Sequence, residues 1–539
     1  MNKEIEDFQT VIRYLYPTRI MKSEGSVIDC NNLLEKSDFL SVTFDRQKVT
    51  RLENSGGERA VVVLDFSKEL SGGIRIISGQ CSENAKIRVV FGESVNEALS
   101  EIGEKGSMND HSPRDVEVFV PSMSDLTHGQ TGFRFVKIEL LTEGFIDIRN
   151  VVAVSRMQNL ERVGKIVTDD ERLNQIIETA VYTCELNMQN GVMWDGIKRD
   201  RLIWAGDLNQ GLLTAQYTFR DFPNVKNSLN YLIAFTDENE WINDMPTYSA
   251  WYVINLCDYC RLSGETEFFK SNYGNIMNIV RRFDEGIGET EINLAKNSDR
   301  IIYHPLFLDW QTVGTPDCEI GSAMLFLMMT HKLLPFLTSE EDRNVCFNIQ
   351  RKLKRYTEKP TLKKQTRAVQ VLCDGNLAGA KEFLERDGAN GFSTFMSYFI
   401  LKALKKSGSD KSVALLKEYY GAMLDRGATS FFEDFELSWL DGSGRIDEIT
   451  PSGLKDLHGD YGAFCYKGFR HSLCHAWSSG IVAFIVEDII GLRTTDGFKT
   501  YTVEPDTSEV KNLQATIPTP YGAIDIRIKD GKLVSAERI

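Results

Sequence analysis

The hydrophobic pattern of the first part of the chain is that of β-strands. From about Arg59 to Ser155, apolar runs and alternations recur with turn residues between them, in the segments AVVVLDF, GGIRIISG, KIRVVFGES, VEVFV, FRFVKIELL and IDIRNVVAV. Short, evenly spaced strands of this kind predict an antiparallel β-sandwich. Residues 1 to about 58 carry mixed signals, and we expect them to add strands or a short helix to the same domain.

After Arg162 the apolar residues recur at helical spacing. The segment TDDE, residues 168–171, predicts a capping box in which Thr168 caps the first helix and Glu171 reaches back. About twelve helical segments follow, most with one apolar face. Twelve helices without intervening strands favour a closed toroid of six helical hairpins, and a superhelical array of helix pairs is the alternative. The absence of a fixed sequence period weighs against the array.

The last segment returns to strand-like sequence. From about Gly497 it reads TYTVEP, QATIPTPYGAIDIRI and KLVSAERI, which is too short for an independent sandwich, so it is expected to pack on the toroid. The predicted fold is multidomain and mainly α. It has an N-terminal antiparallel β-sandwich domain with an unassigned leading segment, an (α/α)6-barrel catalytic domain and a short C-terminal β-domain, at residues 1–160, 161–494 and 495–539.

Composition narrows the range of partners. The chain has 539 residues, 42% hydrophobic and 26% charged, as in an ordinary globular protein with more than one core. Its net charge of −15 opposes binding to nucleic acid or anionic membranes, so a neutral small molecule is the expected ligand. The N-terminal segment has no apolar run of signal-peptide length, and no later segment approaches the length of a membrane span, which predicts a cytoplasmic protein.

Neither the cysteines nor the known cofactor motifs point to a bound group. Ten cysteines are scattered along the chain and are expected to be reduced and mostly buried. Cys257 and Cys260 form a CxxC pair inside a helical pattern, without the second pair that a zinc site requires. The chain has no GxxxxGK[ST], HExxH or GxSxG motif, and no GxGxxG after a strand. The sequence therefore predicts no metal and no cofactor.

The densest chemistry lies in the segment from Trp194 to Asp207, WDGIKRDRLIWAGD, which holds three carboxylates, three cations and two tryptophans. Arg199 and Arg201 can fix carboxylates in orientation by forked hydrogen bonds, as an acid/base site for a polyol requires. A buried ion-pair cluster at a helix N-terminus is the alternative for the same residues.

The tryptophans support a sugar site. All seven lie in the helical region, and five of them are within three residues of an acidic side chain; they are residues 194, 204, 241, 251, 310, 439 and 477. Aromatic faces stack on the C–H faces of sugars while neighbouring carboxylates hold the hydroxyls. For any one tryptophan, core packing is the alternative.

Two later segments supply further candidates. Hydrolysis of a glycoside requires a second carboxylate, and the aromatic-rich segment 428–442 contains Glu433, Asp434 and Glu436. A surface acidic turn is the alternative for that segment. The segment HSLCHAWSSG places His475 and Trp477 at the start of the last helix. A histidine there can also be a structural hydrogen-bonding group.

In this order, DGIKRDRLIWAGD, FLDW at 307–310, ATSFFEDF and SLCHAW resemble the signature segments of glycoside hydrolase family 78, the α-L-rhamnosidases of the six-hairpin glycosidase superfamily. The resemblance covers about residues 60–539, including TGFRFVKIEL and IPTPYG. It implies a β-sandwich, an (α/α)6 barrel and a terminal β-domain. It also implies removal of terminal α-L-rhamnose from small glycosides or oligosaccharides, with inversion.

The resemblance also implies a role for each matching residue. Asp200, seven positions before Asp207, takes the place of the general acid, and Glu433 takes that of the general base. Asp195, Arg199 and Asp207 match residues that bind the sugar hydroxyls, and His475 would donate to a hydroxyl. The full set of implied substrate-binding residues is Asp195, Arg199, Trp204, Asp207, Trp251, Asp309, Trp310, His475 and Trp477.

Three departures from the family pattern keep other functions open. The family commonly has Arg-Asp-Glu-Arg where this chain has only Arg199, Asp200 and Arg201, and Phe432 stands where tryptophan is frequent. An aspartate retracts the carboxyl by about 1 Å, a misplacement that can lower a rate about a hundredfold. The sequence is also short for the family, in which extra sandwich domains are common. The alternatives are an (α/α)6 glycosidase for another sugar, or a carbohydrate-binding protein with a degenerate site. A homo-oligomer is compatible with all of them.

Overall fold

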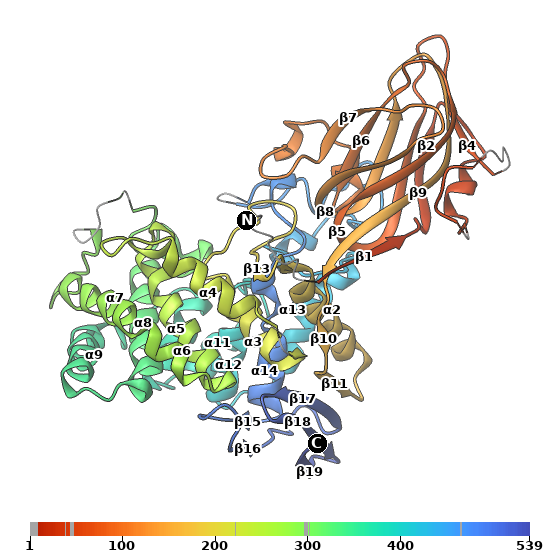
Figure 1. Cartoon of the computed structure of the whole chain (residues 1–539). Helices are drawn as coiled ribbons and strands as arrows, with labels where there is room; N and C mark the ends of the chain where they lie inside the picture. Colours follow the sequence, from red (N-terminus) through yellow and green to blue (C-terminus); the bar gives the residue numbers. More distant parts are fainter. Residues whose placement is uncertain are drawn as a thin grey trace, which may run out of the picture. The chain divides into compact units, whose positions relative to one another are not determined.

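The computed structural model describes residues 9–37, 39–43, 48–220, 222–295, 300, 302–463 and 466–539, apart from the side chain of residue 374. Its chain divides into two compact units. We call the first, Met1–Asn159, Gly196–Arg201 and Met423–His475, the sandwich unit, and the second, Leu160–Asp195, Leu202–Ala422 and Ala476–Ile539, the toroid unit. Figure 1 shows the elements of each along the chain. Among the predicted thiols, Cys465 lies outside the described residues.

Nine described strands of the sandwich unit form one antiparallel sheet, in the order β3-β4-β9-β5-β8-β6-β7, with β1 on β9 and β2 on β5. They are β1 Thr10–Leu15, β2 Arg19–Glu24, β3 Ser26–Ile28, β4 Thr50–Asn54, β5 Val61–Cys81, β6 Lys86–Gly92, β7 Asp115–Phe119, β8 Asp125–Leu140 and β9 Gly144–Gln158. The leading segment contributes four strands and the short helix η1, Cys30–Leu34. The sheet type expected from the alternating pattern is confirmed.

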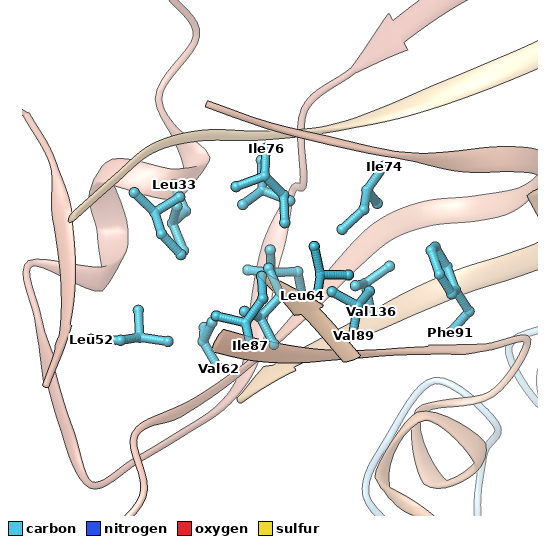
Figure 2. Packing of buried hydrophobic residues seen from close by; sticks show 14 of the residues in the cluster. Leu33, Leu52, Val62, Leu64, Ile74, Ile76, Ile87, Val89, Phe91 and Val136 are labelled. Carbon is cyan, nitrogen blue, oxygen red and sulfur yellow. The ribbon is translucent and has the colours of Figure 1, made fainter. Parts of the chain in front are cut away.

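The long strands connect the two layers of the sandwich. The segments AVVVLDF and GGIRIISG, predicted as separate strands, are one strand, β5, whose register shifts between Asp65 and Leu70 and between Gly72 and Ile74. Its first part pairs with β2 and its second with β9, because the irregularities bend the strand from one layer into the other. Figure 2 shows Ile74 and Ile76 across the core from Val62.

Six helices of the toroid unit pack in a closed ring: α3 on α5, α5 on α8, α8 on α10, α10 on α12, α12 on α14, and α14 back on α3. Their bounds are α3 Leu208–Thr218, α5 Pro246–Ser263, α8 Pro316–Leu333, α10 Lys364–Asp374, α12 Ser397–Lys406 and α14 Ile481–Phe484, the last continued by a π-helical turn at Ile485–Ile489. This ring confirms the toroid and excludes the superhelical array, whose ends would not meet.

Further helices pack on this ring, with α2 against α3, α4 against α5, α9 against α8 and α11 against α12. Their bounds are α2 Glu171–Asn187, α4 Asn224–Ala234, α6 Thr266–Ser271, α7 Tyr273–Gly286, α9 Glu340–Leu353, α11 Ala380–Glu385 and α13 Ser412–Asp425. No helix of the described residues is long and apolar enough to cross a membrane. Cys257 and Cys260 are buried free thiols within α5.

The first helix begins two residues later than predicted. Asp170, not Thr168, is the N-cap of α2 and accepts from the Leu173 amide at 3.0 Å. Thr168 instead ends strand β11, Lys165–Thr168, which pairs with β17 of the C-terminal sheet. The prediction was wrong because this pairing, which covers an otherwise open sheet edge, holds Thr168 in extended backbone.

The C-terminal sheet has the order β11-β17-β18-β19. Strands β17 Leu513–Thr519, β18 Gly522–Lys529 and β19 Lys532–Arg538 follow one another through tight turns, and β17 packs against α3. The expected packing of this small sheet on the toroid is therefore observed. The boundaries 160/161 and 494/495 remain predictions.

Candidate functional site

Three of the predicted binding residues of the toroid unit lie at the N-terminal ends of ring helices. Asp207 directly precedes α3, and Trp310 lies in the 3-10 turn before α8. Trp477 lies in the 3-10 turn before α14. Inner helices that alternate with outer ones run in the same direction, so their N-terminal ends share one side of the ring. The fold thus gathers residues that are up to 270 positions apart, Asp207 and Trp477 among them.

An aromatic array joins two of the predicted tryptophans. The ring of Trp204 lies 5.8 Å from that of Tyr248, Tyr248 lies 6.2 Å from Phe307, and Phe307 lies 5.2 Å from Trp310. The Tyr248 hydroxyl donates to Asp207 Oδ2 at 2.8 Å. Trp204 and Trp310 are each partly exposed. Partly exposed rings beside a carboxylate are what sugar stacking requires.

The other two tryptophans are packed in the core of the ring. Trp251 has no exposed surface and lies between Phe395 and Phe399, at centroid distances of 5.9 and 5.5 Å. Trp477 is 2% exposed and lies 5.0 Å from Phe395. Trp251 and Trp477 both contact Phe395, so their contacts are those expected of tryptophans packed in a core.

Asp309 is a buried carboxyl at the entrance to α8. It accepts from Ser393 Oγ at 2.6 Å and forms a capping box with Thr312. Burial raises the pKa of Asp309 to about 6, against the opposing hydrogen bond from Ser393. The carboxyl is therefore held by hydrogen bonds in a place where its charge is costly.

Asp309→Asn is expected to change the pH dependence of stability. The folded pKa of Asp309 is raised from 3.8 to about 6, so its stabilising contribution is complete below the unfolded value and is lost as pH rises through 6. Relative to the variant, the wild-type free energy of unfolding should fall by about 3 kcal/mol between about pH 4 and pH 7. Urea unfolding across this range measures it. Parallel profiles of the two proteins would contradict the shift.

Asp195 closes the loop that carries the proposed acid. Its amide donates to the Leu202 carbonyl at 3.0 Å, and its Oδ1 accepts from the Leu202 amide at 2.9 Å. Within the loop, Asp200 and Arg201 have φ values of 57° and 56°. Aspartate and asparagine are several-fold enriched in this left-handed region. The backbone at position 200 thus suits an aspartate.

Arg199 bridges the two proposed catalytic carboxylates within the sandwich unit. Its Nη1 donates to Asp200 Oδ2 and its Nη2 to Glu433 Oε1. The guanidinium is fixed by the Arg470 carbonyl, 2.8 Å from Nε, and faces the Tyr466 ring at 5.5 Å. Burial lowers the pKa of Arg199, but the neighbouring carboxylates outweigh it and raise the pKa above its ordinary value. Two carboxyls from distant segments are therefore oriented by one cation.

Glu433 is almost fully buried, with 2% of its side chain exposed. Its Oε2 accepts from the Ser472 amide at 2.8 Å, while its own amide donates to the Ser472 carbonyl at 2.9 Å. His475 Nε2 lies 3.7 Å from Glu433 Oε1. Burial, together with the charge of Arg199, holds the pKa of His475 well below its usual range, so the imidazole is neutral. A neutral imidazole can still donate one hydrogen bond.

The structure brings Arg199, Asp200, Glu433 and His475 together in the sandwich unit. The toroid unit holds Asp195 and the other predicted residues, with Trp204, Asp207 and Trp310 connected through Tyr248 and Phe307. Segment 194–207 therefore contains ion pairs, as the structural interpretation of its sequence predicted. It also contains Asp200, the candidate acid of the functional interpretation.

Sequence reasoning missed His111, whose Nε2 lies 3.5 Å from Asp200 Oδ1. His111 stands in a turn-rich stretch between two predicted strands, where nothing in its neighbours distinguishes it. Sequence reasoning also gave Lys198 no role of its own, although it counted Lys198 among the three cations of segment 194–207. The high density of charged residues in that segment was the signal that could have drawn attention to it.

Comparison with known proteins agrees with this architecture. Residues 161–317 match the sequence profile of a family described as bacterial alpha-L-rhamnosidase 6 hairpin glycosidase domain. The GH78 family rhamnosidase of Bacillus sp. GL1 is similar in fold, with a TM-score of 0.72 and 16% identity over 92% of this chain and 52% of that one. No curated protein matches the sequence.

Two further solved structures are similar. The rhamnosidase from Klebsiella oxytoca with rhamnose bound gives a TM-score of 0.66 and 19% identity, over 88% of this chain and 95% of that one. The Streptomyces avermitilis α-L-rhamnosidase complexed with L-rhamnose gives a TM-score of 0.67 and 14% identity, over 97% of this chain and 49% of that one. The chain spans about half the length of the Bacillus and Streptomyces enzymes.

The fold is that of the six-hairpin glycosidases, a helical toroid with an N-terminal antiparallel sandwich and a C-terminal sheet. Within that class, the profile match and the similar structures confirm the predicted resemblance to the α-L-rhamnosidases of glycoside hydrolase family 78.

Proposed function

We propose that this protein is a glycoside hydrolase that removes terminal α-L-rhamnose from small glycosides or oligosaccharides with inversion at the anomeric carbon. The observation that carries the proposal is the bridge made by Arg199 between the carboxyls of Asp200 and Glu433, which are 233 positions apart in the sequence. Glycoside hydrolysis uses such a carboxyl pair. The resemblance to α-L-rhamnosidases supports the choice of sugar.

The proposed roles follow from exposure and contacts. The side chain of Asp200 is 21% exposed, so a proton and a glycosidic oxygen can reach it, which suits the general acid. Glu433 is buried and accepts hydrogen bonds from Arg199 and from the Ser472 amide, contacts that fix the orientation of its carboxyl and suit the general base. Asp195, Asp207, Asp309 and His475 are proposed to hold hydroxyls, and Trp204 and Trp310 to stack on the sugar.

Incubation with an aryl α-L-rhamnoside tests the activity and its stereochemistry. An inverting enzyme releases β-L-rhamnose first, because water attacks the face opposite the leaving group. Proton NMR in the first minutes identifies the anomer before it equilibrates. Release of the α-anomer first would contradict inversion, and hydrolysis of a different sugar from a panel of aryl glycosides would replace rhamnose by that sugar.

A carbohydrate-binding protein without turnover is the second candidate, and the same bridge favours it. Arg199 engages both carboxyls at once, and Asp200 stands where the related enzymes commonly have glutamate. Calorimetric binding of L-rhamnose without hydrolysis after long incubation would support this candidate. Hydrolysis that is lost on substitution of Asp200 would exclude it.

A further inference from the structure

A buried ion-pair network surrounds Lys198 in the sandwich unit. Lys198 Nζ lies 3.1 Å from Glu93 Oε2 and 3.1 Å from Glu97 Oε1. It also donates to the carbonyl oxygens of Phe469 and His471, each at 2.8 Å. The side chains of Lys198, Glu93 and Glu97 are 8%, 0% and 1% exposed. Glu93 directly follows β6, and Glu97 lies in the short helix α1, Val95–Leu99.

Lys198 supplies the positive charge of this network. Glu93, Glu97 and His458 are close enough to one another to hold a metal ion, but Lys198 Nζ lies 3.5 Å from His458 Nε2 and contacts both carboxylates. Burial and the charge of Lys198 hold the pKa of His458 well below its usual range. The cluster therefore serves the chain's own ammonium group.

The two carboxylates differ in what else they contact. Glu93 Oε1 accepts from Ser472 Oγ at 2.8 Å, and Glu93 Oε2 accepts from the Leu473 amide at 2.5 Å. Glu97 instead accepts from the amide of Glu93 at 2.8 Å and lies in the first turn of α1. Of the two carboxylates, Glu93 is thus the one that connects Lys198 to residues 472 and 473 by hydrogen bonds among the described residues.

Ser472 in turn holds Glu433. Its amide donates to Glu433 Oε2 at 2.8 Å, and its carbonyl accepts from the Glu433 amide at 2.9 Å. A shift of Ser472 would move the Glu433 carboxylate with it. Every member of the chain Glu93, Ser472 and Glu433 is at most 3% exposed, so water does not replace a lost contact without rearrangement.

We infer that Glu93 is a positioning residue for Glu433, acting through Ser472, and that the N-terminal sandwich in this way takes part in the acid/base chemistry. The inference rests on the proposed function for its activity readout. A base displaced by about 1 Å can lose about a hundredfold in rate, so a contact that places Ser472 matters for turnover beyond its share of stability. A buried ion pair by itself is weak evidence for stabilisation.

The pair Glu93→Gln and Glu97→Gln tests the inference. Each change replaces one carboxyl that contacts Lys198 by an amide of the same size, so a role limited to the contacts with Lys198 predicts similar effects. Ser472 Oγ and the Leu473 amide reach different oxygens of Glu93, and an amide keeps only one of these oxygens, so one of the two donors would face an NH2 group instead. We expect Glu93→Gln to lower kcat about tenfold to a hundredfold with KM unchanged, and Glu97→Gln to keep kcat within about threefold. Equal losses of kcat, or a rise in KM alone, would overturn the inference.

A double-mutant cycle provides a second test. Ser472→Ala removes the hydroxyl that Glu93 holds and leaves the backbone contacts of residue 472 with Glu433. If Glu93 acts through Ser472, the double variant should lose no more kcat than the worse single variant, since residues that act on one another are non-additive. Fully additive losses would contradict the route through Ser472.

A crystal structure of the Glu93→Gln variant decides the geometry without reference to activity. The expected result is loss of the contact between the Ser472 amide and Glu433 Oε2. Retention of that contact at its wild-type length would overturn the inference. Absence of wild-type turnover would contradict the proposed function alone, because this structure still tests the positioning of Glu433.

Discussion

Glu433→Gln is expected to lower kcat for an aryl α-L-rhamnoside by about a thousandfold, within the range of 10² to 10⁴ that a positioned acid or base contributes. The amide cannot take a proton from the attacking water. It keeps the shape of the side chain, and its oxygen can still accept from Ser472, so the fold should be retained. Steady-state kinetics and a thermal unfolding curve measure the two effects separately.

Glu436→Gln is the matched control for this prediction. Glu436 lies three residues along the same segment, is half-buried and accepts from Ser438 Oγ at 3.3 Å. We expect its kcat to stay within about threefold of the wild type, since Glu436 has no proposed part in the acid/base chemistry. Comparable losses in the two variants would show that Glu433 has no special role.

Asp200→Asn is expected to lower kcat by an amount that depends on the leaving group. An alkyl rhamnoside leaves as a strongly basic alkoxide and needs the proton of a general acid, whereas a nitrophenyl group leaves more easily without it. We expect about a thousandfold loss on the alkyl substrate and about tenfold on the nitrophenyl substrate. Glu433→Gln should instead affect both substrates alike. Kinetics with the two leaving groups measure the contrast.

Asparagine tolerates the left-handed backbone at residue 200, where φ is 57°, so Asp200→Asn should fold as the wild type does. Asp110→Asn is the control, because Asp110 Oδ2 lies 3.7 Å from His111 Nε2, a neighbour that it shares with Asp200. It should leave the ratio of the two substrates unchanged. Equal losses on both substrates in Asp200→Asn would contradict a role as the acid.

The backbone conformation around the proposed acid was not predictable from the sequence. Asp200 and Arg201 are both left-handed. A short polar side chain such as that of Asp200 suits this conformation, since it can bond to the nearby backbone. The sequence showed the aspartate but not the dihedral angles.

Periodicity predicted the kind of each element well and the ends and connections less well. The helical spacing after Arg162 indicated the toroid, because buried faces recur with the helical turn. The same local signals could not show that β5 is one bent strand, or that residues 165–168 leave the helical segment to pair with β17. Strand pairing over such distances depends on partners that local sequence does not contain.

The candidate site was predictable where its residue types were unusual. Asp200, Glu433 and the tryptophans stand in segments dense in acids and aromatic rings. Glu93 and His111 lie in ordinary strand or loop sequence, and Ser472 lies in a segment that the sequence marked for His475 and Trp477 instead. The contacts of these three residues with the site arise from long-range packing. The burial of Trp251 could not be predicted either, because the position of Trp251 in the helical pattern of α5 does not show whether it faces the core or lines a pocket.

By itself the sequence determined the succession of strands, helices and strands, the segments that carry carboxylates and tryptophans, and the resemblance to the α-L-rhamnosidases. The periods of hydrophobic residues and the local chemistry of side chains are properties of neighbouring positions, so they can be read along the chain. Only the tertiary structure decided that α14 closes the ring on α3 and that one guanidinium joins Asp200 to Glu433. It also decided that a carboxylate of the sandwich supports Ser472. These contacts join residues hundreds of positions apart, and their partners are selected by packing and burial of the whole fold.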